Sequence, residues 1–221
     1  MPIVFESRDG STTVLSEKFG VTYHSKYGAV QESRHVYIKE GLFAKCIAKK
    51  ELSILEMGFG TGLNALMTCL EAEKLELKIN YTAIEKYPIP NEIVGQLNFM
   101  KILEVEGRDD LLCRMHRAEW EKQVEISDFF SLKKLEQAVE DIAFQQGFDL
   151  VYFDAFTPNV QPELWELPML TKMYDALLPT GILVTYCAKG SFKRALKEIG
   201  FKVETLKGPP GKREMTRAVK P

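Results

Sequence analysis

Two kinds of hydrophobic pattern alternate along most of the chain. Short apolar runs of strand length are followed by longer segments in which apolar residues recur every three or four positions. The first kind predicts a buried strand and the second an amphipathic helix. Alternation of the two predicts an α/β fold, with a mostly parallel sheet covered by helices on both faces. The predicted strands span residues 52–58, 77–86, 147–156 and 181–187, and the predicted helices 62–75, 91–99, 162–178 and 190–200.

The two ends of the chain carry patterns of another kind. Residues 3–6 and 12–16 flank the turn signal Asp9-Gly10, which predicts an N-terminal β-hairpin. Residues 201–206 and 213–220 resemble two strands joined by a turn rich in glycine and proline. We therefore expect the parallel sheet to end in an antiparallel hairpin.

Two internal segments are harder to interpret. Residues 35–50 are expected to begin extended and to continue as a helix. Residues 108–146 mix strand-like and helical pieces, and we expect them to hold one sheet strand and an excursion over the sheet.

The composition says more about the cellular compartment of the protein than about its binding partners. The 221 residues carry a net charge of −2, which still allows a local basic patch for RNA phosphates. The four cysteines and three histidines lack metal-ligand spacing, so we expect no metal and a reducing environment. The start lacks a signal-peptide pattern, and no apolar run reaches the ~20 residues of a membrane span. We expect a cytoplasmic protein that does not bind membranes.

Three alternate glycines follow the first predicted strand of the sheet. The motif is E-x-G-x-G-x-G, from Glu56 to Gly62, and Glu85 ends the next strand. Glycines at this edge allow close backbone approach, and an acid there accepts hydrogen bonds from ribose hydroxyls. Together they predict a nucleoside-bearing cofactor. The spacing differs from the dinucleotide motif G-x-G-x-x-G and resembles the first motif of class I S-adenosylmethionine-dependent methyltransferases.

A carboxylate follows the third predicted strand at the same edge. Asp154 with Phe156 has the character of an amine-methylating site, because a carboxylate beside the nucleophile can accept its N–H groups and stabilise developing positive charge. The alternative is that Asp154 only caps the next helix.

The motifs together resemble the methyltransferase domain of the MnmC-type tRNA-modification enzymes. The resemblance runs from about Tyr23 to Ala218 and rests on five segments, "YHSKYGAVQESRHVYI", "EMGFGTGLN", "AIEKYP", "YFDAFTPNVQPELW" and "GKREMTRA". It implies a Rossmann-like class I methyltransferase sheet with S-adenosyl-L-methionine as cofactor. The implied reaction methylates the 5-aminomethyl group of a wobble uridine, often 2-thiolated, in the anticodon region of tRNA. The product is 5-methylaminomethyl-(2-thio)uridine.

The resemblance also assigns roles to individual residues. It implies that residues 1–45 are a hairpin extension and cofactor-covering segment and that 46–221 are the methyltransferase domain. The implied cofactor-binding residues are Gly58, Phe59, Gly60, Gly62, Asn64, Glu85 with Lys86 beside it, and Glu32 with the Tyr23–Ser25 segment over the cofactor. The implied catalytic edge is Asp154, Ala155 and Phe156, and the implied substrate entrance is Lys212, Arg213 and Glu214.

Two features depart from the family pattern. The family usually carries a Gly-Asp pair that binds the adenine amine, and this chain has Gln137-Ala138 there, so Glu136 or a backbone carbonyl is a candidate substitute. Bifunctional members continue into a flavin-dependent oxidoreductase domain, whereas this chain ends at Pro221 without a second glycine-rich βαβ unit. We therefore expect no oxidoreductase activity, and another enzyme would have to supply the aminomethyl precursor.

Two other functions fit the same motifs. An aminopropyltransferase or a small-amine methyltransferase shares the glycine loop, the ribose-binding acid and the acidic catalytic edge. A non-catalytic relative that binds RNA is the third interpretation, because of the Gln137-Ala138 departure. Basic residues between Lys189 and Arg213 favour tRNA, although they also suit a solvated helix face.

Overall fold

The computed structural model describes residues 3–47, 49–105 and 107–221, and within them the main sheet has eight strands in the order β5-β6-β4-β3-β7-β8-β10-β9. The central strands β6, β4, β3, β7 and β8 run parallel, and β5, β10 and β9 pair antiparallel with their neighbours. This arrangement confirms the predicted fold class, including the C-terminal antiparallel hairpin. The strands are β3 Glu51–Met57, β4 Lys78–Glu85, β5 Gln123–Ser127, β6 Phe130–Glu136, β7 Phe148–Phe153, β8 Leu177–Thr185, β9 Lys202–Lys207 and β10 Glu214–Val219, and a separate hairpin joins β1 Ile3–Glu6 to β2 Thr12–Leu15.

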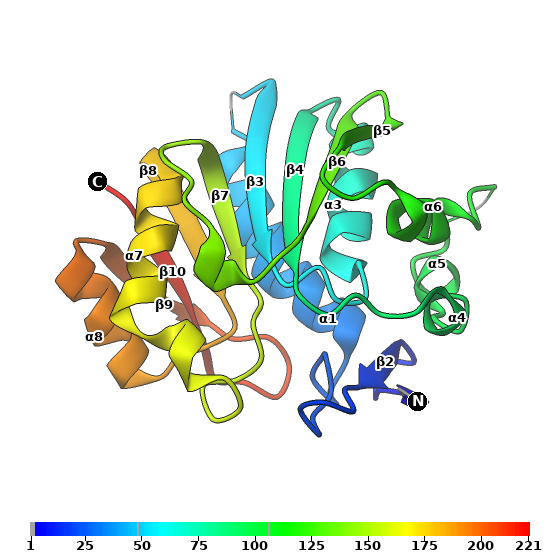
Figure 1. Cartoon of the computed structure of the whole chain (residues 1–221), viewed down its shortest axis with the longest axis horizontal. Helices are drawn as coiled ribbons and strands as arrows, with labels where there is room; N and C mark the ends of the chain where they lie inside the picture. Colours follow the sequence, from blue (N-terminus) through cyan, green and yellow to red (C-terminus); the bar gives the residue numbers. More distant parts are fainter. Residues whose placement is uncertain (1–2, 48, 106) are drawn as a thin grey trace.

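Helices cover both faces of the sheet (Figure 1). One face packs against α7 and α8, and the other against α3 and the long helix made of α1, η1 and α2. No helix within the described ranges is both long enough and apolar enough to cross a bilayer. The helical segments are α1 Ala29–Ser33, the π-helical η1 Arg34–Leu42, α2 Phe43–Lys45, α3 Leu63–Lys74, α4 Asn91–Val94, α5 Phe99–Ile102, α6 Leu111–Arg117, the 3₁₀ turns η2 Val139–Asp141 and η3 Pro162–Trp165, α7 Leu167–Ala176 and α8 Gly190–Ile199.

Helix α3 shows how the sequence pattern becomes structure. Leu63, Leu66 and Met67 are buried at helical spacing against the sheet. The helix ends where Glu76 takes a left-handed φ of 50°, and the N–H of Leu77 donates to the carbonyl of Ala72. That pairing of a left-handed residue with a returning hydrogen bond is a common way to end a helix.

The expectation of an extended start to residues 35–50 is wrong. The chain is helical from Ala29 to Lys45, although Ala48 lies outside the described residues. The β-branched and aromatic run Val36-Tyr37-Ile38 favours a strand locally, but all three side chains are buried in the core beside the sheet. Gly41 explains the close approach, because a Cβ there would lie 3.0 Å from Val184. Tertiary packing therefore overrides local propensity.

Three other predicted segments divide differently. Residues 108–146 hold two strands and a helix instead of one strand, because β5 and β6 form a hairpin at the sheet edge. Residues 91–99 form the single-turn helix α4 and the start of a second one, α5, with Gly95 and Asn98 between them. Residues 162–178 break at Glu166, the extended N-cap residue of α7, and pass into β8 at Leu177.

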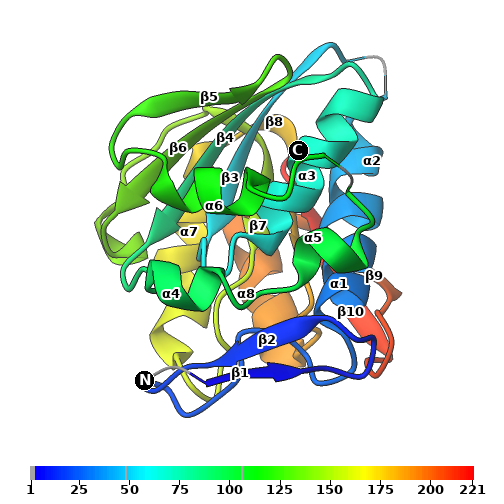
Figure 2. The same ribbon diagram turned by 90° about the vertical axis from the view of Figure 1, so that its right-hand side faces the viewer.

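The N-terminal hairpin lies below the sheet edge at which the parallel strands end (Figure 2). Asn98 ties it to the body, since its amide accepts from the N–H of Thr12 and donates to the carbonyl of Gly10, both at 2.8 Å. The turn of the hairpin also bonds the start of α1. Asp9 accepts from the N–H of Gln31 at 3.0 Å, and the Ser11 hydroxyl accepts from the N–H of Ala29 at 3.1 Å.

Asp9→Ala should lower the free energy of unfolding by about 1–2 kcal/mol, the usual cost of losing a helix-capping side chain. Burial raises the pKa of Asp9, but hydrogen bonds from Ser11, Gln31 and Ser7 outweigh it, so the net pKa is lowered. A lowered pKa means that the ionised form stabilises the fold above pH ~4 and that this contribution fades as the pH falls below it. Urea unfolding at pH 7 and pH 3 measures both effects. Asp9→Asn, which keeps an acceptor, should lose less, and equal losses at both pH values would contradict the assignment.

Candidate active site

The carboxyl ends of three neighbouring strands meet in register at one edge of the sheet. Met57 at the end of β3 pairs with Ile84 of β4 and with Phe153 of β7. The next residues are therefore Gly58, Glu85 and Asp154, which stand side by side. A cavity of about 280 Å³ opens here, close to the size typical of small-molecule sites. Its walls are the glycine loop, the ends of β4 and β7, residues 139–140 and the N-terminal segment 16–24.

The glycine loop reverses the chain within five residues. Gly58, Gly60 and Gly62 have φ values of 89°, 50° and 74°, all in the left-handed region that favours glycine. Side chains would also collide, since a Cβ on Gly60 would lie 3.0 Å from the Tyr23 ring and one on Gly62 would lie 2.9 Å from His116. The alternate spacing of the glycines thus produces the sharp turn from β3 into α3.

Glu85 holds the loop from the neighbouring strand. Its carboxylate accepts from the N–H of Gly60 at 2.9 Å and from the N–H of Tyr87 at 2.7 Å. Burial raises the pKa of Glu85, and these backbone hydrogen bonds oppose the rise. Glu85 and the exposed Lys86 both line the cavity.

Asp154 is linked to the loop helix by an amide. The Asn64 Nδ2 atom donates to Asp154 Oδ2 at 2.8 Å and to Glu56 Oε1 at 3.0 Å. The turn that follows, η3, has no side-chain cap, so Asp154 is not the helix cap that the alternative interpretation required. Burial raises the pKa of Asp154 to about 6, helped by the charge of Glu32 and opposed by Tyr37, Asn64 and Lys212.

A group of buried polar atoms lies beside Asp154 without hydrogen-bond partners of standard geometry. Among the described residues these are the Tyr37 and Tyr81 hydroxyls, Glu56 Oε2 and Asn64 Oδ1. Glu56 is 1% exposed, and burial raises its pKa well above the ordinary value. Burial thus favours the protonated form of Glu56 over its ionised form.

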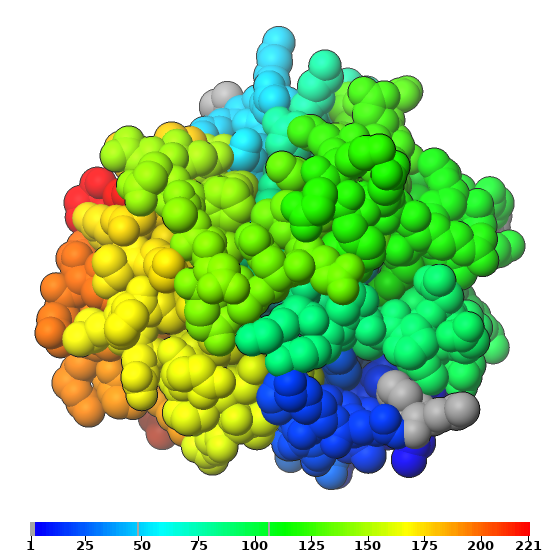
Figure 3. Space-filling model, in the orientation of Figure 1, coloured from blue at the N-terminus to red at the C-terminus, as the bar shows by residue number. Residues whose placement is uncertain are grey.

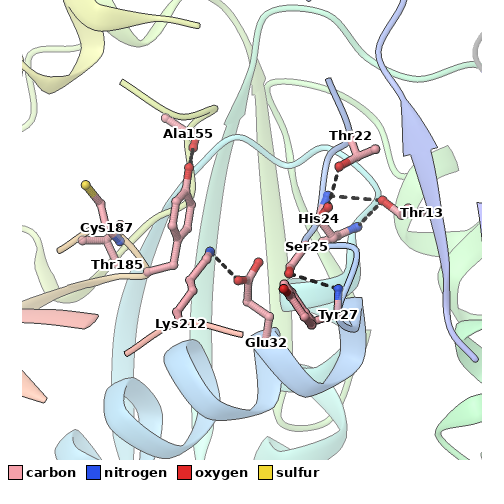
Figure 4. Close-up of polar contacts among 11 residues, drawn as sticks. Thr13, Thr22, His24, Ser25, Tyr27, Glu32, Ala155, Thr185, Cys187 and Lys212 are labelled. Carbon is pink, nitrogen blue, oxygen red and sulfur yellow. Dashed lines mark hydrogen bonds and ion pairs between the residues drawn. The ribbon is translucent and has the colours of Figure 1, made fainter. Parts of the chain in front are cut away.

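Beyond Asp154, away from the cavity, two ends of the chain meet in an ion pair. Lys212 Nζ lies 2.5 Å from Glu32 Oε2, and Figure 4 shows the lysine reaching from the C-terminal loop toward the start of the long helix. The same ammonium lies 3.7 Å above the centre of the Tyr186 ring. The Tyr186 hydroxyl donates to the carbonyl of Ala155 at 2.8 Å.

The N-terminal segment covers the cavity on its other side. The ring of Phe156 lies 4.9 Å from Phe19 and 5.1 Å from Tyr23. In the space-filling view the N-terminal residues, in blue, touch the teal and yellow-green segments that border the cavity (Figure 3). His24 connects this cover to the glycine loop through a hydrogen bond with the Thr61 hydroxyl. Its other ring nitrogen makes a hydrogen bond with the hydroxyl of Thr13 in β2, which appears in Figure 4.

Most of the residues assigned from sequence converge on the cavity, and a smaller group lies beside it. Gly62 is the residue before α3, and Glu32 and Lys212 form the ion pair next to Asp154, while Arg213 is exposed. Those that line the cavity are Gly58, Phe59, Gly60, Asn64, Glu85, Lys86, Asp154, Ala155 and Phe156, together with Tyr23 and His24.

Some site residues were not found from the sequence. Val139 and Glu140 line the cavity where Gln137-Ala138 was expected to matter, and Phe19 lines it from the cover. Tyr37 was hidden in a segment interpreted as extended, and Tyr186 carried no motif signal. No group of three or more His, Cys, Asp or Glu side chains in the described part of the chain is arranged to hold a metal ion.

Comparison with known proteins finds similar methyltransferases. A family model described as "S-adenosyl-L-methionine-dependent methyltransferase" matches residues 113–221. The match covers just under half of the chain, and over these residues the chain is similar to S-adenosyl-L-methionine-dependent methyltransferases. Its cofactor is accordingly S-adenosyl-L-methionine, as predicted.

The curated relatives of this methyltransferase are MnmC proteins. The protein from Aromatoleum aromaticum named "tRNA 5-methylaminomethyl-2-thiouridine biosynthesis bifunctional protein MnmC" is 30% identical over 219 residues, covering 93% of this chain and 33% of the relative. The protein of the same name from Burkholderia multivorans is 27% identical over 230 residues, covering 97% of this chain and 34% of the relative. The methyltransferase thus spans about a third of the length of the curated relatives it matches.

Solved structures agree with the sequence comparison. The crystal structure of MNMC2 from Aquifex aeolicus matches with a TM-score of 0.80 and 26% identity, covering 99% of this chain and 69% of that one. A spermidine synthase from Thermotoga maritima matches with a TM-score of 0.54 and 15% identity, covering 100% of this chain and 72% of that one. The second likeness shows a shared fold only.

Asp154→Asn should make the methyltransferase more stable above pH 6. The folded pKa of about 6 lies above the ordinary 3.8, so folding favours the protonated acid, and ionisation costs stability as the pH rises from 4 to 6. Removing the charge should raise the free energy of unfolding by about 1–3 kcal/mol at pH 8, with little change near pH 4.

Urea unfolding of both proteins at pH 4, 6 and 8 measures this difference. A variant that is no more stable than the parent at pH 8 would show that the Asp154 carboxylate is well solvated.

Proposed function

We propose that this methyltransferase transfers a methyl group to the primary amine of 5-aminomethyl-(2-thio)uridine at the wobble position of tRNA, giving 5-methylaminomethyl-(2-thio)uridine. The observation that carries the proposal is the partly buried carboxylate of Asp154, held by Asn64 at the edge of the cavity. A carboxylate there suits an amine nucleophile. The names of the relatives support a tRNA product of this kind.

The residues around the cavity fit S-adenosyl-L-methionine. We propose that the methionine part lies on the loop from Gly58 to Gly62, where left-handed glycines expose backbone groups. The Glu85 carboxylate, already at the cavity wall, would accept the ribose hydroxyls, with Lys86 beside it. Val139 and Glu140, which line the cavity, are the nearest candidates for the adenine, in place of Glu136, the substitute suggested from the sequence. Tyr23 and Phe156 would close the cavity over the cofactor.

The chemistry needs little beyond positioning. When bound, the cofactor supplies a methyl group on a positively charged sulfur. The attacking amine must be neutral, because only then does it have a lone pair. The C–N bond forms as the C–S bond breaks, and the product ammonium later releases one proton to water.

Asp154 would accept the N–H bonds of the amine, direct its lone pair and stabilise the positive charge that develops on nitrogen. With a pKa of about 6, it can also accept a proton from the amine more readily than an ordinary carboxyl group.

We place the tRNA backbone on the basic side of the entrance. Arg213 is exposed next to the ion-paired Lys212, and Arg194 and Lys197 on α8 are exposed as well. These side chains are available to phosphates, whereas Lys193 of the same helix pairs with Glu214 at 3.0 Å. Glu32 was expected to bind the cofactor, but its pairing with Lys212 favours the substrate side.

Glu85→Ala should weaken binding of S-adenosyl-L-methionine by about 1.5–3 kcal/mol, the range for hydrogen bonds to a charged group. The loop also loses its bond from the N–H of Gly60, so Glu85→Gln, which keeps acceptor and shape, separates ribose recognition from loop support. Isothermal titration calorimetry measures all three proteins. Unchanged affinity in Glu85→Ala would remove the ribose assignment.

Asp154→Ala should keep cofactor affinity near the parent value and lose roughly 100-fold or more in turnover, the scale of one catalytic electrostatic group. The measurement is single-turnover methylation of tRNA bearing the aminomethyl group between pH 6 and 9, where the parent rate should rise as the amine becomes neutral.

Putrescine as acceptor tests the small-amine alternative, and a chain that binds the cofactor without any transfer would support the non-catalytic one. A variant with the parent rate and pH profile would rule out a role for Asp154 in the chemistry.

A further inference from the structure

Four side chains outside the cofactor cavity gather beside Asp154. Glu32 raises the pKa of Asp154, and both carboxylates raise the pKa values of the Tyr37 and Tyr186 hydroxyls. Lys212 completes the cluster through its contacts with Glu32 and Tyr186. The cluster joins the long N-terminal helix, the end of β7, the end of β8 and the C-terminal loop.

The cluster has the composition of an ammonium-binding site. Two carboxylates, those of Glu32 and Asp154, belong to the cluster. The Tyr186 ring lies beneath the Lys212 ammonium, whose nitrogen is 3.7 Å from the centre of the ring. Aromatic faces attract cations, and buried carboxylates need positive partners. The Glu32 side chain is only 9% exposed, while the Lys212 side chain is 30% exposed and can move toward solvent.

The lysine leaves part of this site unused. An ammonium has three N–H donors, and the Lys212 ammonium donates to Glu32 alone among the described residues. The Tyr37 hydroxyl, on a residue that is 1% exposed, has no hydrogen bond of standard geometry, although it interacts with Asp154 and lies near Glu32. Among the described residues, Asn64 makes the one hydrogen bond of standard geometry to the Asp154 carboxylate, and the Tyr37 hydroxyl interacts with this carboxylate more loosely. The Tyr37 hydroxyl and the Asp154 carboxylate can therefore still accept hydrogen bonds from a second or a better-placed ammonium.

We propose that Asp154, Glu32, Tyr37 and the ring of Tyr186 form a subsite for a primary alkylammonium group, and that the Lys212 ammonium occupies part of it until the aminomethyl group of the substrate displaces it. The assignment rests on the proposed function, because an aminomethyl group is a primary alkylammonium before it loses its proton. Glu32 and Tyr186 are then specificity-determining residues. A hydroxymethyl group of the same shape carries no charge with which to displace the lysine.

The loop around Lys212 suits such an exchange. Gly208 and Gly211 flank the Pro209-Pro210 pair, and Gly211 has a left-handed φ of 84°. The N–H of Lys212 donates to the carbonyl of Pro209 at 2.9 Å, so the backbone turn is fixed. The lysine side chain can therefore leave the subsite by rotation of its own bonds.

Lys212→Met removes the competing ammonium and tests the displacement. The probe is the nucleoside 5-aminomethyluridine, which has no phosphate, titrated calorimetrically with S-adenosylhomocysteine present. An occupied site weakens the apparent affinity by the fraction of molecules in which it is open. If Lys212 leaves the subsite in about a tenth of the molecules, its loss should tighten probe binding about tenfold. 5-Hydroxymethyluridine should bind more weakly than the probe in both the parent and this variant, because it has no positive charge to pair with Glu32 and Asp154.

Lys49→Met is the matched control. Lys49 pairs with Asp149, and the whole residue Asp149 is 7% exposed, as is the whole residue Glu32. This pair lies beside the start of β3, at the opposite end of the parallel strands from the cavity. This variant should bind the probe as the parent does. If Lys212→Met fails to fold because Glu32 is left unpaired, the double variant Glu32→Gln with Lys212→Met restores neutrality. That variant should bind the aminomethyl and hydroxymethyl nucleosides about equally.

Equal or weaker binding of the probe by Lys212→Met would overturn the displacement. The competing assignment, a phosphate contact for Lys212, predicts no effect on the nucleoside, weaker tRNA binding and a salt dependence lower by about one. Arg213→Ala should behave in that second way.

A parent that binds the probe but methylates no aminomethyl-tRNA would refute the proposed function alone. A parent that methylates it, with no gain in Lys212→Met, would refute the subsite exchange alone.

Discussion

The Asn64 amide, bonded at once to Glu56 and to Asp154, is the constraint around which the site is built. To make both hydrogen bonds, Asn64 near the start of α3 must lie next to Glu56 near the end of β3. The chain therefore has to reverse its direction within the five-residue glycine loop. Only left-handed φ values make so short a reversal, which is why glycines occupy alternate positions. The same bridge fixes the carboxylate after β7 against the loop. The glycine loop and the carboxyl end of β7 are therefore tied together in one unit and are not two independent motifs.

Three buried carboxyl groups lie around this unit, and the protein stabilises each in a different way. Burial raises the pKa of Glu56 and favours its protonated form, and Glu32 has a lysine partner. Asp154 has an amide and no full counter-charge, so its pKa rises only to about 6. It can therefore be charged at neutral pH at some cost to stability. Stability and reactivity oppose each other at this position, as is common where a charged group must serve a reaction.

The sequence predicted what depends on short, regular patterns. The strand and helix alternation, the glycine loop and the strand-end acids all follow from local spacing, and the fold and the cofactor were predicted correctly from them. Failures came where tertiary packing overrides local preference. Val36-Tyr37-Ile38 has the composition of a strand but forms a helix because it is buried beside the sheet, and this error concealed Tyr37. Val139 and Glu140 reach the cavity through a 3₁₀ turn that carries no recognisable pattern.

The two ends of the chain that fall outside the alternating pattern complete opposite sides of the site. The N-terminal segment lies over the cofactor cavity through Phe19 and Tyr23, and His24 ties it to the loop. The C-terminal loop brings Lys212 to the other side of Asp154. Each end supplies what a bare parallel sheet lacks, since the strand ends alone offer an open edge. Aromatic rings close one side of this edge, and the partly exposed ammonium of Lys212 stands beside Glu32 on the other, which is the side from which we propose that the amine reaches Asp154.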